Sequence, residues 1–221
     1  MSNKILVYSV SGYEGDVDWI SNYEMTDKIE EAQVVVFPGG ADINPELYGF
    51  EEHPKTYYSK SADKRDLAAY KKMNKDQLAV GICRGAQFLC AMNGGKLIQD
   101  VKGHSIDKTH QIHTIQRPQI ELQCYSLHHQ MMYPFNLPDD DYTLLYVAAC
   151  GTDHENITHD LKTGERLDLN RMFERGEPEV VLFHKENTPL GLAIQSHPEM
   201  MRVDSGFVKE MNKIITKLLE K

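Results

Sequence analysis

The chain has 221 residues, of which 41% are hydrophobic and 26% are charged. This mix is typical of a globular protein with a packed core, and we expect a single domain over residues 1–221. Lysine and arginine number 24 against 33 aspartates and glutamates, and the resulting net charge of −9 disfavours binding to a phosphate backbone. We read neither a membrane-spanning run nor a secretory leader in the sequence, so we expect a cytoplasmic protein that binds neither nucleic acid nor membranes.

Apolar stretches of strand length alternate with helical patterns in the first half of the chain. We expect strands at 5–10, 34–37 and 78–82, and helices over about 63–73 and 85–93. This alternation predicts an α/β fold with a largely parallel central sheet flanked by helices.

Shorter β-prone stretches separated by polar turns fill the second half. They cover residues 111–116, 142–148, 180–184 and 192–195, and they predict an antiparallel ribbon in the C-terminal half. Apolar side chains recur at the helical period over 207–219, which predicts a closing helix that packs on the sheet.

The segment Gly81-Ile82-Cys83-Arg84-Gly85 joins an expected strand to an expected helix. Glycines two residues before and two after the cysteine relieve crowding at a sharp turn, as in the G-x-S-x-G nucleophile elbow. The helix N-terminus favours the thiolate form of Cys83. Cys83 is therefore a candidate nucleophile, although this motif alone fits a buried structural cysteine equally well.

Two further segments follow apolar strands and offer groups that a cysteine nucleophile needs. In Gln195-Ser196-His197-Pro198-Glu199, the residues His197 and Glu199 share one face of an extended chain, so the carboxylate can orient the imidazole. The Pro38-Gly39-Gly40 turn can present a main-chain amide to a developing oxyanion, with the amide of Arg84 as the second donor. Taken singly, each segment is equally well an ordinary turn.

Together these segments resemble class I glutamine amidotransferases, and more closely the γ-glutamyl hydrolases of peptidase family C26. The matching blocks are F-P-G-G-A-D-I-N-P-E-L-Y-G at 37–49, G-I-C-R-G-A-Q at 81–87 followed by G-G-K-L-I-Q-D at 94–100, S-L-H-H-Q at 126–130 and Q-S-H-P-E at 195–199. Four blocks in the family's order span most of the chain and are far more specific than any one of them.

The resemblance implies a flavodoxin-like fold and a Cys83–His197–Glu199 triad that cleaves a γ-glutamyl amide through a thioester on Cys83. It places Gly40 and Arg84 at the oxyanion and implies no cofactor. It also implies a set of substrate-binding residues, namely Gly39, Gln87, Ser126, His128 and His129.

The chain departs from the family pattern in two places, of which the first bears on the fold and the second on substrate preference. Only about 37 residues precede the Pro-Gly-Gly turn, so we expect one strand or helix of the N-terminal half to be reduced or missing. The family's R-D-x-x-E element is half kept, as Arg65-Asp66 followed by Leu67-Ala68-Ala69-Tyr70.

Two other functions remain open on the sequence. The protein can be a glutaminase subunit that uses L-glutamine and delivers ammonia to a separate synthetase chain, or a non-catalytic binding relative. The histidines at 104, 110, 113, 128 and 129 invite a metal hypothesis. Because they form no H-x-x-x-H pair and have no cysteine or carboxylate ligand at a suitable spacing, we expect no metal site.

Overall fold

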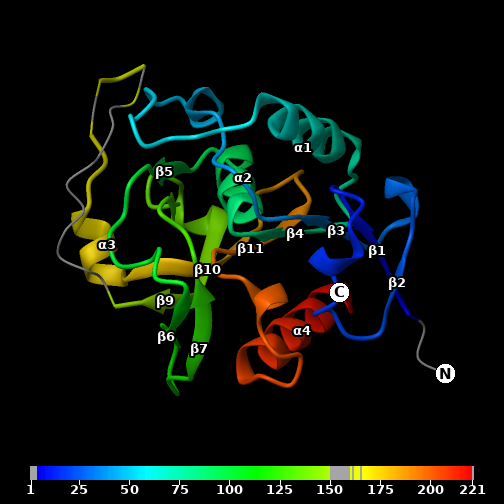
Figure 1. Cartoon of the computed structure of the whole chain (residues 1–221). Helices are drawn as coiled ribbons and strands as arrows, with labels where there is room; N and C mark the ends of the chain where they lie inside the picture. The colour runs from blue at the N-terminus through cyan, green and yellow to red at the C-terminus, as the bar shows by residue number, and fades with distance from the viewer. Residues whose placement is uncertain (1–3, 150–159, 161, 165, 221) are drawn as a thin grey trace.

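A nine-stranded mixed sheet runs through the structure, a computed structural model that describes residues 4–149, 160, 162–164 and 166–220 (Figure 1). Across the sheet the strands are β2 (Tyr23–Met25), β1 (Ile5–Ser9), β3 (Val34–Phe37), β4 (Leu78–Ile82), β11 (Leu190–Ile194), β10 (Glu177–Phe183), β9 (Tyr142–Ala148), β6 (Lys108–Thr114) and β7 (Glu121–Ser126). Two further strands, β5 (Lys96–Ile98) and β8 (Met131–Tyr133), form a separate antiparallel pair.

The sheet has a parallel half and an antiparallel half. Strands β2, β1, β3, β4 and β11 run parallel to one another. Strand β10 pairs with β11 in antiparallel fashion, and β9, β6 and β7 continue the sheet as antiparallel strands. This confirms the predicted parallel sheet with an antiparallel ribbon in the C-terminal half.

Helices cover both faces of the sheet because its strands are apolar on both sides. In β3, Val35 and Phe37 face one core cluster, whereas Val34 and Val36 face the other. Helices α1 (Lys60–Lys72) and α2 (Arg84–Met92) pack on the first side with the short α3 (Asn170–Arg175), and α4 (Gly206–Leu219) packs on the second (Figure 1). The closing helix is confirmed, with Phe207, Val208, Met211 and Ile215 buried.

The N-terminal region keeps its strands and shortens its connections. Strands β1, β2 and β3 are all present, but single 3₁₀ turns at Glu14–Asp16 and Ile29–Glu31 join them where a longer chain could form helices. The expected reduction therefore falls on the connecting segments.

Register in the parallel half decides where the turns of the predicted site meet. Phe37 pairs with Gly81, and Ile82 pairs with Ile194, so the carboxyl ends of β3, β4 and β11 lie at one edge of the sheet. The segments that begin at Pro38, Cys83 and Gln195 leave from that edge. Open α/β sheets commonly bind ligands at such an edge.

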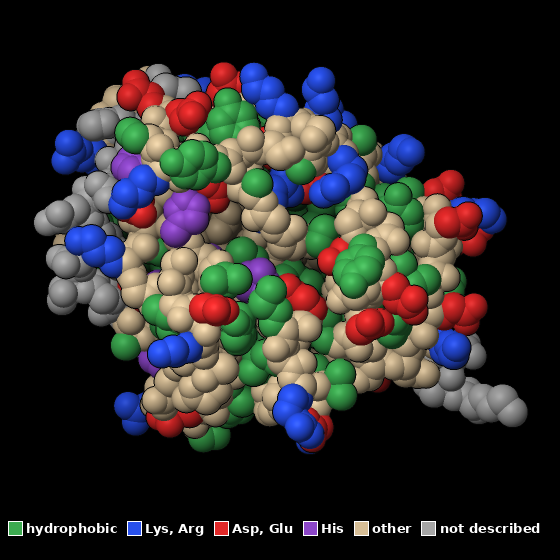
Figure 2. All heavy atoms as spheres, viewed as in Figure 1, with side chains coloured by type: hydrophobic (Ala, Val, Ile, Leu, Met, Phe, Trp, Pro, Cys, Tyr) green, Lys and Arg blue, Asp and Glu red, His purple; other side chains and the backbone are tan. Residues whose placement is uncertain are grey.

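The surface charge and the lengths of the helices bear on the expectation that the protein binds neither nucleic acid nor membranes. Figure 2 shows acidic and basic side chains mixed over the visible face. Within the described ranges, the helices are all too short or too polar to cross a bilayer.

Candidate active site

Cys83 occupies a strained turn between β4 and α2. Its φ of 49° and ψ of −103° lie in a region that non-glycine residues rarely adopt. The Cys83 N–H donates to the Ile194 carbonyl at 2.8 Å, and the Gln87 N–H donates to the Cys83 carbonyl at 3.1 Å. The turn is thus the sharp strand-to-helix elbow that the glycine spacing predicts.

The two glycines of this elbow leave no room for a side chain. An ideal Cβ at Gly81 would lie 2.4 Å from the Gly85 carbonyl oxygen, and one at Gly85 would lie 1.9 Å from the Phe37 carbonyl oxygen. Both distances are far below van der Waals contact, so β3, β4 and the start of α2 can pack this closely only with glycine at these positions.

His197 interacts with both Cys83 and Glu199. Its Nδ1 lies 2.6 Å from Oε1 of Glu199, and the His197 and Glu199 side chains are only 8% and 18% exposed. Burial lowers the pKa of His197, but hydrogen bonds with the Cys83 thiol and the Glu199 carboxylate outweigh it and raise the pKa to about 10. The imidazole therefore lies between a thiol and a carboxylate.

The Pro38–Gly40 turn contacts this pair of side chains. An ideal Cβ at Gly39 would lie 3.2 Å from Cε1 of His197 and 3.9 Å from Cβ of Cys83. At Gly40, where φ is +152°, it would lie 3.4 Å from Cδ of Arg84. The turn thus borders the thiol, and Arg84 is the first residue of α2, whose early amides have no acceptor within the helix.

The side chain of Arg84 is held inside the protein by two carboxylates of α1. Its guanidinium is 2% exposed and pairs with Asp63 at 2.6 Å and with Asp66. At the elbow Arg84 can therefore offer its main-chain amide. Sequence reasoning did not single out Asp63, and the half-kept Arg65-Asp66 element on the same helix was the nearest signal to it.

Gln87, Ser126 and His128 make contacts within the protein. The Gln87 Nε2 donates to the Gln130 carbonyl at 2.9 Å, and the Ser126 hydroxyl donates to the His104 carbonyl at 2.6 Å. His128 places Nδ1 2.9 Å from the Gln130 carbonyl oxygen. All three side chains are buried, and these contacts hold segment 126–130 against α2 and the loop around His104.

His129 lies on the outer side of the same segment. Its side chain is 36% exposed, and Nε2 is 3.1 Å from the Asp42 carboxylate. The hydrogen bond to Asp42 raises the pKa of His129. Asp42 follows Gly40 by two residues, so His129 borders the turn that contacts Cys83.

The other described cysteines are poor nucleophile candidates. Cys90 and Cys124 are fully buried, and burial raises the pKa of the Cys90 thiol to about 12. Burial also raises the pKa of Cys124, as does the nearby Glu179 carboxylate. Cys150 lies outside the described residues.

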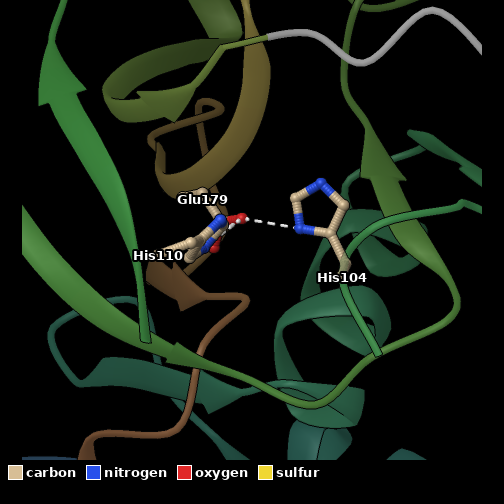
Figure 3. Close-up of side chains that lie close together, drawn as sticks. All are labelled: His104, His110 and Glu179. Carbon is tan, nitrogen blue, oxygen red and sulfur yellow. Dashed lines mark ion pairs between the residues drawn. The ribbon is translucent and has the colours of Figure 1, made fainter. Parts of the chain in front are cut away.

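One group of side chains was not expected. His104 and His110 converge on Glu179, a carboxylate far away in the sequence (Figure 3). The prediction that these histidines have no carboxylate at ligand distance is therefore wrong, because β6 and β10 both pair with β9 in the antiparallel ribbon.

Comparison with known proteins agrees with the fold. The model of the family described as Peptidase C26 matches residues 20–199. The glutamine amidotransferase-like protein YvdE of Lactococcus lactis subsp. lactis is 36% identical over 94 residues, which are 41% of this chain and 37% of that protein. Its homologue in Lactococcus lactis subsp. cremoris is 38% identical over 85 residues, 37% of this chain and 42% of that protein. The matches thus span less than half the length of these relatives.

Two solved structures share the architecture. A protein from Thermoplasma acidophilum, described as part of a GMP synthase, superposes with a TM-score of 0.60 at 14% identity, covering 100% of this chain and 96% of that one. A glutamine amidotransferase from Thermotoga maritima gives a TM-score of 0.54 at 14% identity, covering 99% and 96%. At this identity the two structures support the fold alone.

The family match covers the Pro38–Gly40 turn, the Cys83 elbow and the segment that ends at Glu199. The chain belongs to the peptidase C26 family, within the class I glutamine amidotransferase-like superfamily.

Proposed function

We propose that the protein is a cysteine-nucleophile hydrolase that releases glutamate from a small γ-glutamyl amide. The observation that carries this proposal is the position of His197, whose ring interacts with the Cys83 thiol and the Glu199 carboxylate at the strained elbow. A nucleophile, a base and a group that orients the base are the three parts that covalent catalysis of this kind needs.

In the first half of the reaction, the Cys83 thiolate attacks the γ-carbonyl carbon of the substrate. The carbonyl oxygen becomes an oxyanion and accepts hydrogen bonds from the main-chain amides of Gly40 and Arg84. Protonated His197 then donates its Nε2 proton to the departing amine. The C–N bond breaks, and a γ-glutamyl thioester remains on Cys83.

In the second half, water attacks the thioester. His197, now neutral, takes a proton from the water through Nε2, and the tetrahedral intermediate collapses to free the Cys83 thiolate and glutamate. The Glu199 carboxylate stays on Nδ1 throughout, where it fixes the tautomer and stabilises the imidazolium. Every proton transfer in this scheme uses a group of this chain.

We assign the substrate side to Gly39, which borders Cys83, and to His129, which is partly exposed and contacts Asp42 just after the same turn. The other three residues expected there, Gln87, Ser126 and His128, act by holding segment 126–130 in place. This proposal thus assigns direct contact to His129 and positioning to the buried three.

A glutaminase subunit is the second candidate, and the amidotransferase names of the relatives favour it. In that case the substrate is L-glutamine, the leaving group is ammonia, and a separate synthetase chain consumes it. A non-catalytic binding relative is disfavoured because such a protein has no need to keep Cys83, His197 and Glu199 in contact.

The test is glutamate release by the purified protein from L-glutamine and from a panel of γ-glutamyl amines, peptides and other conjugates. Release from one conjugate, with little from L-glutamine, supports the stand-alone hydrolase and gives its leaving-group class. Release from L-glutamine alone favours the glutaminase subunit. Silence on the whole panel, with correctly folded protein, contradicts the hydrolase.

A further inference from the structure

Three histidines surround one carboxylate oxygen in the antiparallel half of the protein. His104 precedes β6, His110 lies in β6, His128 follows β7, and Glu179 lies in β10. We call these four residues the histidine–glutamate cluster. Figure 3 shows His104 and His110 turned toward the Glu179 carboxylate.

Three donor atoms of the cluster are spaced like ligands around a common point, and the fourth, on His128, lies slightly farther from Glu179. Oε1 of Glu179 lies 3.3 Å from Nδ1 of His104, 3.2 Å from Nε2 of His110 and 3.7 Å from Nε2 of His128. The donor atoms of His104, His110 and Glu179 all lie within 4.8 Å of one another.

These four atoms are buried, yet none of them makes a hydrogen bond. Nδ1 of His104, Nε2 of His110, Nε2 of His128 and Oε1 of Glu179 have no partner of acceptable hydrogen-bond geometry. Nδ1 of His104 and Nε2 of His110 lie within hydrogen-bond distance of the carboxylate oxygen, but the angles are not those of a hydrogen bond. Buried polar atoms left in this way are costly, so the arrangement calls for a further group between them.

The outer nitrogens of two rings show what kind of group it is. Nε2 of His104 lies 2.7 Å from the Glu177 carboxylate, and Nδ1 of His128 lies 2.9 Å from the Gln130 carbonyl oxygen. The carboxylate and the carbonyl can only accept hydrogen bonds, so Nε2 of His104 and Nδ1 of His128 each carry a hydrogen atom. In a neutral ring the inner nitrogen then presents a lone pair, and in this cluster the lone pairs face an anionic oxygen. The lone pairs and the anionic oxygen repel one another, and a cation bound between the nitrogens and the oxygen removes this repulsion.

We propose that the histidine–glutamate cluster binds a divalent transition-metal ion of the zinc class. Tetrahedral zinc holds nitrogen and oxygen ligands at about 2.0–2.1 Å, which places neighbouring ligand atoms about 3.3 Å apart. Two of the three contacts to Glu179 have this separation, and the third is within half an ångström of it. Softer or harder cations fit three imidazoles and one carboxylate less well.

The surroundings also match those of metal-bound histidine. Such a histidine donates its other ring N–H to a carboxylate or a main-chain carbonyl, which are the partners of His104 and His128 here. His104, His110 and Glu179 are the three ligands that converge, and His128, whose Nε2 is 3.7 Å from Oε1 of Glu179, is the residue placed to complete a closed, structural site. It ties the His104 loop and segment 126–130 to β10, where the Glu179 carbonyl accepts from the Gln195 N–H at 2.8 Å.

The site is independent of the proposed reaction, so its test does not use activity. The purified full-length chain is stripped with a chelator, titrated with Zn²⁺, and assayed for bound metal after desalting. We expect one Zn²⁺ per chain and a higher unfolding temperature. Co²⁺ used as the probe should give the intense visible absorption of a tetrahedral nitrogen and oxygen site. If the stripped chain takes up neither ion, the proposal is overturned. A proton on His104 then balances the negative charge of the Glu179 carboxylate.

Variants separate this site from adventitious binding. His110→Ala should abolish stoichiometric Zn²⁺ retention, whereas His113→Ala, on the same strand and outside the cluster, should retain it. Glu177→Gln keeps all four ligands and should weaken Zn²⁺ affinity about 10- to 100-fold. If His110→Ala fails to fold, the Glu177→Gln titration decides. Equal Zn²⁺ affinity in that variant and the parent chain overturns the proposal.

Discussion

Gly85 packs directly on Phe37, so that a Cβ atom at position 85 would lie 1.9 Å from the Phe37 carbonyl oxygen. This contact presses the start of α2 against the end of β3. The Cys83 elbow and the Pro38–Gly40 turn are thereby held as one rigid unit, which is how a nucleophile and an oxyanion donor keep a fixed separation.

Gly85→Ala should therefore be severely destabilising. The added methyl group meets main-chain atoms that cannot rotate away, and we expect a loss of at least about 3 kcal/mol in the free energy of unfolding. Urea denaturation measures it. Gly206→Ala is the matched control, because a Cβ there would lie 3.5 Å from Cδ2 of Leu122, an ordinary contact. Equal stability of the two variants would show that the elbow is looser than described.

Asp66→Ala should destabilise the fold through Arg84. The guanidinium cannot lose its proton, and with Asp66 removed it keeps only Asp63 as a buried counter-charge. Breaking a buried pair in this way costs about 3–5 kcal/mol, measurable by urea denaturation. The exposed pair Lys28–Glu31 provides the contrast, and Glu31→Ala should leave the unfolding midpoint nearly unchanged. A small effect of Asp66→Ala would mean that Asp63 alone suffices.

The raised pKa of His197 predicts that the free energy of unfolding depends on pH. Its pKa is about 10 in the folded protein and about 6.5 in an unfolded chain. Because the folded value is the higher one, its contribution is complete below pH ~6.5 and is lost as pH rises toward 10. The free energy of unfolding should fall over that window. The difference between the parent and His197→Gln isolates the contribution of this residue from that of other groups that titrate in the window.

Parallel pH profiles for the parent and His197→Gln would contradict that assignment. An NMR titration gives a second test, because Cys83→Ala removes an interaction that raises the pKa of His197. The His197 pKa should therefore fall in the Cys83→Ala variant.

Glu199→Gln should lower kcat with little change in KM. The amide cannot stabilise the imidazolium at Nδ1, and orienting groups of this type contribute about 10²- to 10⁴-fold. Steady-state kinetics on the best substrate of the panel measures the effect. Glu186→Gln, at an exposed turn, is the control and should match the parent. A fully active Glu199→Gln variant removes Glu199 from the mechanism.

Thiol labelling should distinguish the described cysteines. At neutral pH, iodoacetamide should modify Cys83 faster than Cys90 or Cys124, because both of the latter are 0% exposed, against 7% for Cys83, and burial raises the pKa of each. Peptide mapping by mass spectrometry locates the label. Faster modification of Cys90 than of Cys83 would count against Cys83 as the activated thiol.

The parallel half of the fold was predictable because its signals are local. Strands β3 and β4 begin and end where the apolar runs do, and Cys83 lies at the turn that its glycines indicate. Strand β7 was missed because Glu121–Ser126 borders the sheet and is polar along much of its length. The short helix α3 lies in a charged stretch with no apolar period, so no sequence signal marked it.

The histidine–glutamate cluster could not be predicted from spacing. His104 and Glu179 are brought together only by the order β10-β9-β6-β7, in which β6 and β10 both pair with β9. Sequence reasoning finds chemistry within a motif or at the ends of parallel strands. It does not find residues whose proximity depends on the register of an antiparallel ribbon.

The most direct test of the account is the rate of glutamate release by Cys83→Ala and Cys90→Ala, each folded as the parent, on the best γ-glutamyl substrate of the panel. We predict that Cys83→Ala loses at least about 10³-fold in kcat, because the thioester cannot form, and that Cys90→Ala keeps the parent rate. Normal turnover by Cys83→Ala, or loss of turnover in Cys90→Ala alone, would contradict the assignment of Cys83 as the nucleophile.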